Sequence, residues 1–322
     1  MSANMAKNIQ EKYFITGGAG FIGSHLVDRL ISQGKQVVVY DNLSSGNLAN
    51  LKNVLKNKNF KFIKGDLIDY KKLKKSIKTS SVVFHLASNT NMIKGNAKTD
   101  VDLNDSIIGT RNLLEAMRTS GIKNIYFASS GSVYGNADAP VLIESYGPLL
   151  PISLYGAGKL AAEGLVSAFC ELFDMKACIF RFGNICGHRI KRGVVYDFIV
   201  KLKKNPKELL ILGDGNQSKN YLLVDDCIDG MFEIFQKSKK QYDTFNIGND
   251  VYADVNSIAD IVVKEMNLSG VKYKHTAGKG GWKGDIPVSH FNIDKARNLG
   301  WKPKYDSAQT VKIAARRILD NK

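Results

Sequence analysis

The fold is decided by the stretch YFITGGAGFIG, residues 13–23. Its first four residues, Tyr13–Thr16, predict a buried strand, and the glycines after them let the backbone approach a phosphate at the N-terminus of a following helix. A second apolar run, Val37–Tyr40, ends in Asp41, 24 residues after Gly17. A carboxylate near this offset typically binds the ribose 2′-hydroxyl of a dinucleotide and would repel a 2′-phosphate. The stretch therefore predicts a dinucleotide-binding unit with a preference for NAD over NADP.

Short β-branched runs alternate with helix-like segments along the first half of the chain, which is typical of a parallel sheet with crossover helices. The expected strands are residues 13–16, 37–40, 60–63, 82–85, 125–128 and 177–181. The expected helices are residues 20–33, 70–79, 105–120 and 154–173. This pattern predicts an α/β protein with a Rossmann-type, doubly wound parallel sheet.

The alternation weakens after about residue 184, where stretches rich in Gly, Lys and Asn appear at 187–193, 203–207, 213–220 and 278–285. We expect a dinucleotide-binding domain at residues 1–183 and a smaller, loop-built lobe for the substrate at 184–322. A segment near 221–250 is expected to return to the first domain, with a strand at Thr244–Ile247.

The net charge of +16 raises the possibility of nucleic-acid binding. Only nine of the 46 basic residues are Arg, and the lysines at 71, 72, 74, 75 and 78 have the spacing of a solvated helix face, with Leu73 and Ile77 on the opposite side. Charge patterning thus favours a lysine-rich surface over a nucleic-acid site. Such a surface still suits an anionic small-molecule substrate.

Cysteine usage and hydropathy indicate a cytoplasmic protein without a membrane partner. No apolar run approaches the ~18 residues of a membrane span, and the first dozen residues lack the apolar core of a secretory signal. The four cysteines and the five histidines show no metal-ligand spacing, so we expect no metal. His85, at the end of a predicted strand, is interpreted as a packing residue.

A series of motifs in the expected order resembles the extended short-chain dehydrogenase/reductase family, particularly the UDP-glucose 4-epimerases and related nucleotide-sugar enzymes. The motifs are Thr16–Gly23, Asp41–Gly46, Gly65-Asp66-Leu67, His85-Leu86-Ala87 and Gly109-Thr110. The resemblance covers nearly the whole chain and implies NAD as cofactor. It places twelve residues against NAD: Gly17, Gly20, Phe21, Ile22, Gly23, Asp41, Asn42, Asp66, Leu67, Leu86, Ala87 and Lys159.

The catalytic residues follow from a Tyr-x-x-x-Lys pair, which the resembled family uses with both side chains on one helix face. The chain offers Tyr155 with Lys159 and also Tyr70 with Lys74. The second pair lies on the lysine-rich solvated helix and is interpreted as a chance match. The first pair opens a long apolar helix and follows the segment ASSGSVYG, residues 128–135, in which Ser130 resembles the family's catalytic serine. A lysine and a positive nicotinamide ring would lower the pKa of Tyr155 so that it can exchange a proton.

The set of Ser130, Tyr155 and Lys159 favours C4 epimerisation as the reaction. Related dehydratases carry an acidic pair after the serine, whereas Gly131 and Ser132 stand there in this chain. The resemblance implies further substrate contacts at Asn184, Leu212, Lys219, Trp282 and Ser289, besides Ser130 and Tyr155.

The chain departs from the family at several of these positions. Lys219 replaces an arginine and can hold phosphate only as a point charge; Trp282 replaces another arginine, and either stacks on the nucleoside or belongs to the core. A small residue at 289 predicts that UDP-GlcNAc and UDP-GalNAc are accepted along with UDP-Glc and UDP-Gal.

Two other functions stay open at this point. The chain could epimerise or decarboxylate a UDP-uronic acid, with Arg189 or Arg192 binding the extra carboxylate, or it could be a non-catalytic regulator that binds NAD or a nucleotide sugar. The resemblance also implies a homodimer through the helices at 105–120 and 154–173. The apolar stripe Ile107, Ile108, Leu113, Leu114 and Met117 is expected against the sheet or a partner subunit.

Overall fold

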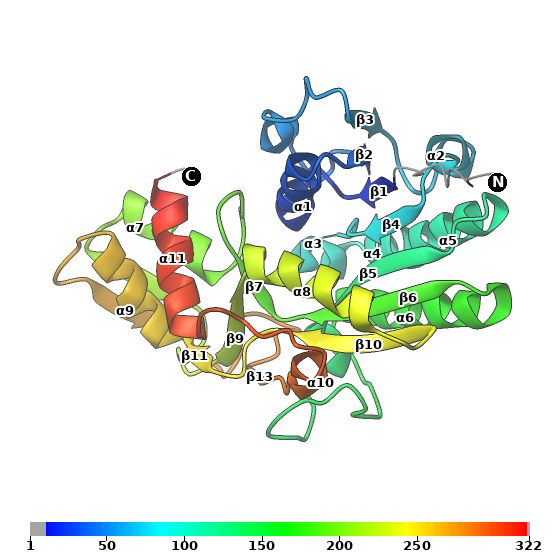
Figure 1. Cartoon of the computed structure of the whole chain (residues 1–322). Helices are drawn as coiled ribbons and strands as arrows, with labels where there is room; N and C mark the ends of the chain where they lie inside the picture. The colour runs from blue at the N-terminus through cyan, green and yellow to red at the C-terminus, as the bar shows by residue number, and fades with distance from the viewer. Residues whose placement is uncertain (1–10, 90, 321–322) are drawn as a thin grey trace, which may run out of the picture.

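A seven-stranded parallel sheet forms the centre of the computed structural model, which describes residues 11–89 and 91–320 (Figure 1). The strand order is β10-β6-β5-β4-β1-β2-β3, and every neighbouring pair is parallel. The strands are β1 (Lys12–Thr16), β2 (Gln36–Asp41), β3 (Phe60–Lys64), β4 (Val82–His85), β5 (Asn124–Ser130), β6 (Lys176–Phe182) and β10 (Tyr242–Ile247). The predicted Rossmann-type sheet is thus confirmed. The chain order reverses between β1 and β4, and ligands bind α/β sheets at the strand carboxyl ends of such a point.

Helices cover both faces of this sheet because successive strand residues point to opposite sides. Val37 and Val39 belong to a core that also takes up residues of α1 and α8, whereas Val38 belongs to the core under α2, α5 and α6. The helices are α1 (Phe21–Ser32), α8 (Val224–Lys237), α2 (Tyr70–Ile77), α5 (Gly109–Thr119) and α6 (Leu154–Phe173). In α2, Leu73 and Ile77 are fully buried as the pattern predicts.

The helix expected at 105–120 is less regular than its sequence suggests. It begins as a π-helical turn, η2 (Leu103–Ile108), which follows α4 (Asp100–Asp102). Leu113, Leu114 and Met117 are fully buried against the sheet, but Ile108 keeps 39% of its surface exposed. The wider π turn rotates the stripe, so its first part no longer faces the core.

The second part of the chain is more ordered than the loop-built lobe that we expected. The helices α7 (Val194–Lys204), α9 (Val255–Glu265) and α11 (Ser307–Leu319) share a core of their own with β9 (Ser218–Leu223). The predicted loop at 213–220 therefore already contains the start of a strand. β9 connects the two parts, since Tyr221 and Leu223 belong to this core and Leu222 to that of the large sheet.

Short elements complete the molecule. They are η1 (Leu48–Leu51), α3 (Met92–Ala97), η3 (Gly131–Tyr134), β7 (Asn184–Cys186), β8 (Glu208–Ile211), β11 (Tyr252–Asp254), β12 (Lys272–His275), β13 (Val288–Ser289) and α10 (Asp294–Arg297). β7, β11 and β13 all pair with β9, and β12 pairs with β8.

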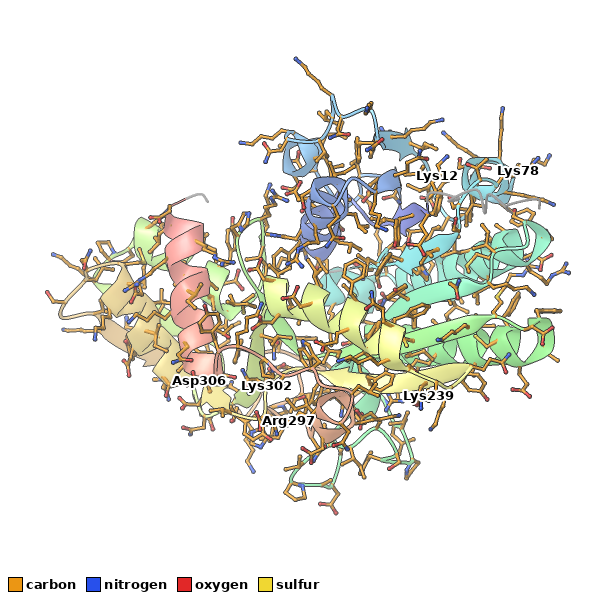
Figure 2. All side chains as sticks on the ribbon, viewed as in Figure 1. Lys12, Lys78, Lys239, Arg297, Lys302 and Asp306 are labelled. Atoms are coloured by element: carbon orange, nitrogen blue, oxygen red, sulfur yellow. The ribbon has the colours of Figure 1, made fainter. Side chains whose placement is uncertain are left out.

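The surface is dominated by long charged side chains that extend into solvent, Lys78 and Lys239 among them (Figure 2). Within the described residues, no helix has the length and apolar character that crossing a membrane requires.

Candidate active site

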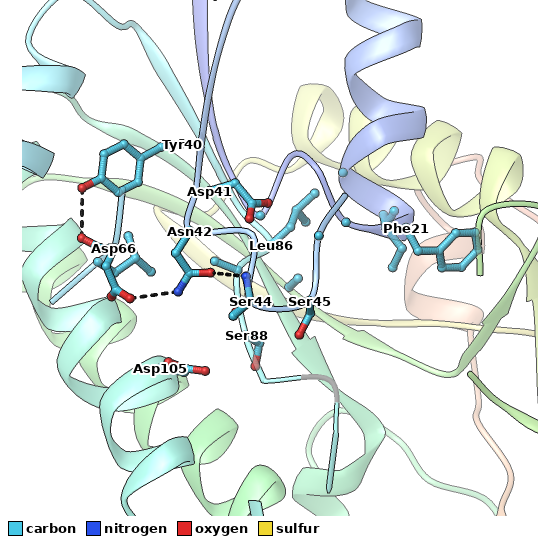
Figure 3. A pocket seen from close by; sticks show the side chains of 18 of the residues that line it. Phe21, Tyr40, Asp41, Asn42, Ser44, Ser45, Asp66, Leu86, Ser88 and Asp105 are labelled. Atoms are coloured by element: carbon cyan, nitrogen blue, oxygen red, sulfur yellow. Dashed lines mark hydrogen bonds between the residues drawn. The ribbon is translucent and has the colours of Figure 1, made fainter. Parts of the chain in front are cut away.

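A first hollow lies at the carboxyl ends of β1, β2 and β4 (Figure 3). All twelve residues expected to contact NAD line it: Gly17, Gly20, Phe21, Ile22, Gly23, Asp41, Asn42, Asp66, Leu67, Leu86, Ala87 and Lys159. Eleven of them come from the ends of β1, β2, β3 and β4 and from the start of α1, which the parallel sheet brings together, and Lys159 comes from α6.

The turn after β1 is built tightly around two glycines. Gly17 has a φ of +72°, and a Cβ there would lie 2.6 Å from the Ala87 nitrogen; a Cβ at Gly23 would lie 2.3 Å from the Gly17 oxygen. A side chain at either position would therefore push apart the turn, the first helix and the loop after β4. By contrast, a Cβ at Gly20 would meet only the Gly17 oxygen, at 3.1 Å. Gly20, at the N-terminus of α1, is thus the more open position of this turn, and a pyrophosphate there stays a prediction.

The acidic side of this hollow is rigidly held. Asp41 is 8% exposed, and its carboxylate accepts hydrogen bonds from the Ala19 nitrogen at 3.0 Å and the Leu43 nitrogen at 2.8 Å. Burial raises the pKa of Asp41, and these two bonds oppose the rise. Asn42 donates to Asp66 at 2.9 Å, which joins the ends of β2 and β3 across the mouth of the hollow (Figure 3). Together, Asp41, Asn42 and Asp66 fit the adenosine half of a dinucleotide.

His85 is a structural residue, as we expected. Its ring is 1% exposed, with Nδ1 2.7 Å from the Thr16 hydroxyl and Nε2 2.9 Å from the Thr110 hydroxyl. Burial lowers its pKa to about 3, with Lys159 adding to the effect, so the ring is neutral at physiological pH. It ties β1 and β4 to α5 beneath the hollow.

Tyr155, Lys159 and Ser130 meet where this hollow adjoins a second one. Ser153 caps α6 by accepting a hydrogen bond from the Gly156 nitrogen at 3.1 Å, which places Tyr155 in the first helical turn. Lys159 is 3% exposed and donates to the Ala128 carbonyl at 2.7 Å. Ser130 ends β5 and lies close enough to Tyr155 to lower the pKa of its phenol against the effect of burial. Tyr155 lines both hollows.

The protein groups alone leave the pKa of Tyr155 well above neutral pH. Burial raises its pKa to about 12, with the Ser130 hydrogen bond opposing and the Asp102 charge adding to the rise. Burial lowers the pKa of Lys159 to about 8, against the charges of Asp102 and Glu163. Tyr155 is therefore protonated at neutral pH in the chain alone, and a positive charge placed beside it would lower its pKa.

Tyr70 and Lys74 form no comparable site. Lys74 Nζ lies 5.9 Å from the Tyr70 ring centre on α2, and neither residue lines the two hollows. Tyr155 and Lys159 thus line a hollow, whereas Tyr70 and Lys74 do not, and the catalytic role of the first pair stays a prediction.

Most of the residues expected to contact the substrate line the second hollow. Ser130, Tyr155, Asn184, Leu212, Lys219 and Trp282 line it, whereas Ser289 does not. Ser289 lies in β13 beside Lys219, and its carbonyl accepts a hydrogen bond from Asn220 at 3.2 Å. Its role as a gate stays a prediction.

Lys219 has an acidic partner that its sequence position did not reveal. Its Nζ lies 2.6 Å from Asp285 Oδ1, and Asp285 Oδ2 accepts a hydrogen bond from the Gly281 nitrogen at 3.0 Å. Asp285 also lines the hollow, so the positive charge of Lys219 is partly neutralised there. Trp282, three residues before Asp285, lies on the wall of the hollow and not in the core.

Other lining residues were missed from the sequence. Asn91 and Met92 follow β4, and Tyr196 and Lys201 belong to α7. Neither segment carries a glycine-rich or paired-charge motif. Of the two arginines proposed for a uronic acid, Arg192 lines the hollow, while Arg189 pairs with Asp28 at 2.6 Å.

A buried ion pair supports the catalytic helix from behind. Arg181 of β6 donates to both oxygens of Glu163 of α6, at 3.0 and 2.8 Å, and Ser129 donates to Glu163 at 2.5 Å. All three are at most 7% exposed. In the part of the chain that the structure describes, no group of three or more His, Cys, Asp or Glu side chains could hold a metal ion.

Comparisons with known proteins agree with this geometry. The family model described as "NAD dependent epimerase/dehydratase family" matches residues 13–248. A putative UDP-glucose 4-epimerase of Methanocaldococcus jannaschii is 34% identical over 307 residues, which cover 92% of this chain and 95% of the relative.

Two solved structures are also similar. A crystal structure of a UDP-galactose 4-epimerase has a TM-score of 0.84 at 35% identity and covers 95% of this chain and 97% of its own. The UDP-N-acetylglucosamine 4-epimerase of Methanobrevibacter ruminantium M1, in complex with UDP-N-acetylmuramic acid, has a TM-score of 0.86 at 28% identity and covers 97% of this chain and 99% of its own.

Proposed function

Because the chain belongs to the NAD-dependent epimerase/dehydratase family, we propose that it inverts C4 of a UDP-sugar. The substrates proposed are UDP-Glc and UDP-Gal, together with UDP-GlcNAc and UDP-GalNAc. The observation that carries the proposal is the position of Tyr155, which lines both hollows, while Ser130 lines the second hollow with it. Tyr155 could therefore act as a base on a hydroxyl of a sugar in the second hollow, while the nicotinamide of NAD occupies the first.

NAD fits the first hollow, since the close-packed turn at Gly17 would hold the pyrophosphate and Asp41 the adenosine ribose. When bound, NAD would supply a hydride acceptor, and then a hydride donor, for C4 of the sugar. Tyr155 accepts the proton of the C4 hydroxyl as the hydride leaves, and Ser130 holds that oxygen in place. The 4-keto sugar then turns in the second hollow, and Tyr155 returns the proton when the hydride is delivered to the other face.

Epimerisation is favoured over 4,6-dehydration by the surroundings of Gly131. A Cβ there would lie 2.4 Å from Cζ of Phe291, which is itself fully buried. An acidic side chain of the kind needed to eliminate water does not fit unless Phe291 moves.

A UDP-uronic acid is the second candidate, and Arg192 at the second hollow is the observation in its favour. The set of Ser130, Tyr155 and Lys159 argues against a non-catalytic regulator, which has no use for a proton-transfer group.

Proton NMR tests the proposal. The purified protein is mixed separately with UDP-Glc, UDP-GlcNAc and UDP-GlcA, without added cofactor. We expect the anomeric signal of the C4 epimer to appear with the first two, and about 100- to 10,000-fold more slowly with Tyr155→Phe. Epimerisation of UDP-GlcA alone would select the uronic acids. No epimer from any of the three, even after NAD is added, would overturn the proposal.

Two further points belong to the proposal. A homodimer would cover apolar side chains on η2 and α6 that are exposed here: Leu103 (48%), Ile108 (39%) and Leu172 (72%). A cytoplasmic setting suits the four cysteines, which are all buried and unpaired.

A further inference from the structure

The loop at residues 187–193, between β7 and α7, forms part of the wall of the second hollow. Ile190, Arg192 and Gly193 line that hollow, and Lys191 beside them is exposed. The loop has no helix or strand of its own. Its shape therefore depends on the elements that it contacts, and the shape of the hollow depends on the loop.

The loop is packed against α1, the helix that begins at the first hollow. A Cβ at Gly187 would lie 3.4 Å from the ring of Phe21 and 2.8 Å from Cγ1 of Val224 in α8. His25 Nε2 lies 3.1 Å from the His188 carbonyl oxygen, and the two imidazole rings are 4.2 Å apart, edge to face. Phe21 itself lines the first hollow (Figure 3). The contacts thus run from the cofactor side to the loop at the substrate side.

An ion pair completes this contact between the loop and α1. Arg189 Nη2 donates to Asp28 Oδ2 at 2.6 Å, and the two side chains are 16% and 31% exposed. Their other terminal atoms, Arg189 Nη1 and Asp28 Oδ1, are shielded from solvent and have no hydrogen-bond partner among the described residues. Removal of either side chain would therefore leave a largely buried charge without the group that is hydrogen bonded to it.

The backbone of Arg189 is strained. Its φ is +67°, in the left-handed region that residues with a Cβ rarely adopt. Such a conformation persists only where the surrounding structure holds it. The ion pair with Asp28 is formed by this same residue, three positions before Arg192, so its loss would let the loop relax next to the second hollow.

We propose that Asp28 and Arg189 form a latch, which holds the loop at 187–193 in the shape that binds the substrate. Neither residue lines either hollow, so both are positioning residues that act through the loop. Arg189 thereby has a role other than binding the carboxylate of a uronic acid. The inference rests on the proposed function for the identity of the substrate.

Cleavage of the folded protein after Lys191 by the lysine-specific protease Lys-C tests the latch without a sugar. The two fragments are quantified by mass. We expect cleavage about tenfold faster or more in Asp28→Ala and in Arg189→Met, because the loop opens more often. The control is Asp229→Ala, which removes the 2.7 Å pair with Arg29 of α1 and should leave the rate unchanged. The proposal fails if neither latch variant is cleaved faster, or if the control is accelerated equally.

Steady-state kinetics separate positioning from general stability. We expect Asp28→Ala to raise KM for UDP-Glc about tenfold and to leave kcat within about twofold, because the loop binds the substrate and does not carry Tyr155. Asp28→Glu keeps the carboxylate and should leave KM close to that of the unaltered protein. A lowered kcat with an unchanged KM in Asp28→Ala would contradict the latch. The absence of epimerase activity in the unaltered protein would count against the proposed function alone, since Lys-C cleavage needs no substrate.

Discussion

Gly17 and Gly121 have nearly the same backbone conformation, with φ of +72° and +71°, but different surroundings. A Cβ at Gly17 would lie 2.6 Å from the Ala87 nitrogen, while nothing lies within 4 Å of one at Gly121. Gly→Ala at either position introduces left-handed strain of about 1–2 kcal/mol. Only Gly17→Ala also brings a side chain against the backbone of Leu86 and Ala87.

We therefore expect Gly17→Ala to weaken NAD binding by about tenfold or more, the equivalent of roughly 1.4 kcal/mol, and Gly121→Ala to leave it unchanged. Isothermal titration calorimetry with NAD, beside urea unfolding of both variants, measures the two effects separately. Equal NAD affinities would show that the close approach of Gly17 to Ala87 does not matter.

At the residue scale, the sequence predicts the cofactor side better than the substrate side. The cofactor residues stand at strand ends, and a parallel sheet gathers the carboxyl ends of its strands at one edge. The partner of Lys219 is Asp285, 66 positions away, and no periodic pattern links them. Ser289 was expected at the substrate, but the sequence could not show that it pairs with Lys219 in β9 without lining the second hollow.

Strand β6 and helix α6 are joined by the ion pair of Arg181 and Glu163, whose side chains are 6% and 8% exposed. We expect Arg181→Met to lower the free energy of unfolding by about 3–5 kcal/mol, because it leaves a buried carboxylate without its cation. The control is Arg297→Met, whose pair with Asp250 is 40% and 33% exposed and should contribute about 0–1 kcal/mol. Urea unfolding of both variants checks this.

A double variant tests whether the unpaired buried charge causes the loss of stability. Replacing both partners, Arg181→Met with Glu163→Leu, removes the unpaired charge and should regain part of the loss. If Arg181→Met and Arg297→Met lost similar stability, burial would not be the cause.

At the element scale, the six strands expected in the first half lie within two residues of their observed bounds, because fully covered strands are continuously apolar. β9 was missed because its first half is polar and resembles a loop: Lys219 lines the second hollow, and Asn220 is a fully buried polar residue. The π turn of η2 was also missed, since the apolar periodicity of residues 105–120 fits an ordinary helix.

The association of whole molecules is predicted from exposed apolar side chains on η2 and α6. We expect light scattering to give about twice the chain mass of 35.5 kDa, and the double variant Ile108→Glu with Leu172→Glu to reduce it to one chain. Val200 of α7 is 46% exposed, and Val200→Glu serves as the control that should stay dimeric. A single-chain mass for the unaltered protein at micromolar concentration would exclude the dimer.

The late position of β10 in the sequence also affects how the sheet forms during synthesis. β6 ends at Phe182, and the strand that covers its outer edge begins only at Tyr242, about 60 residues later. A ribosome that adds about 5–20 residues per second needs roughly 3–12 s for that interval. Throughout it, the emerging sheet has an unpaired edge of the kind that recruits other strands. Chaperone demand during synthesis should therefore be greatest after β6 has emerged and end when β10 has paired.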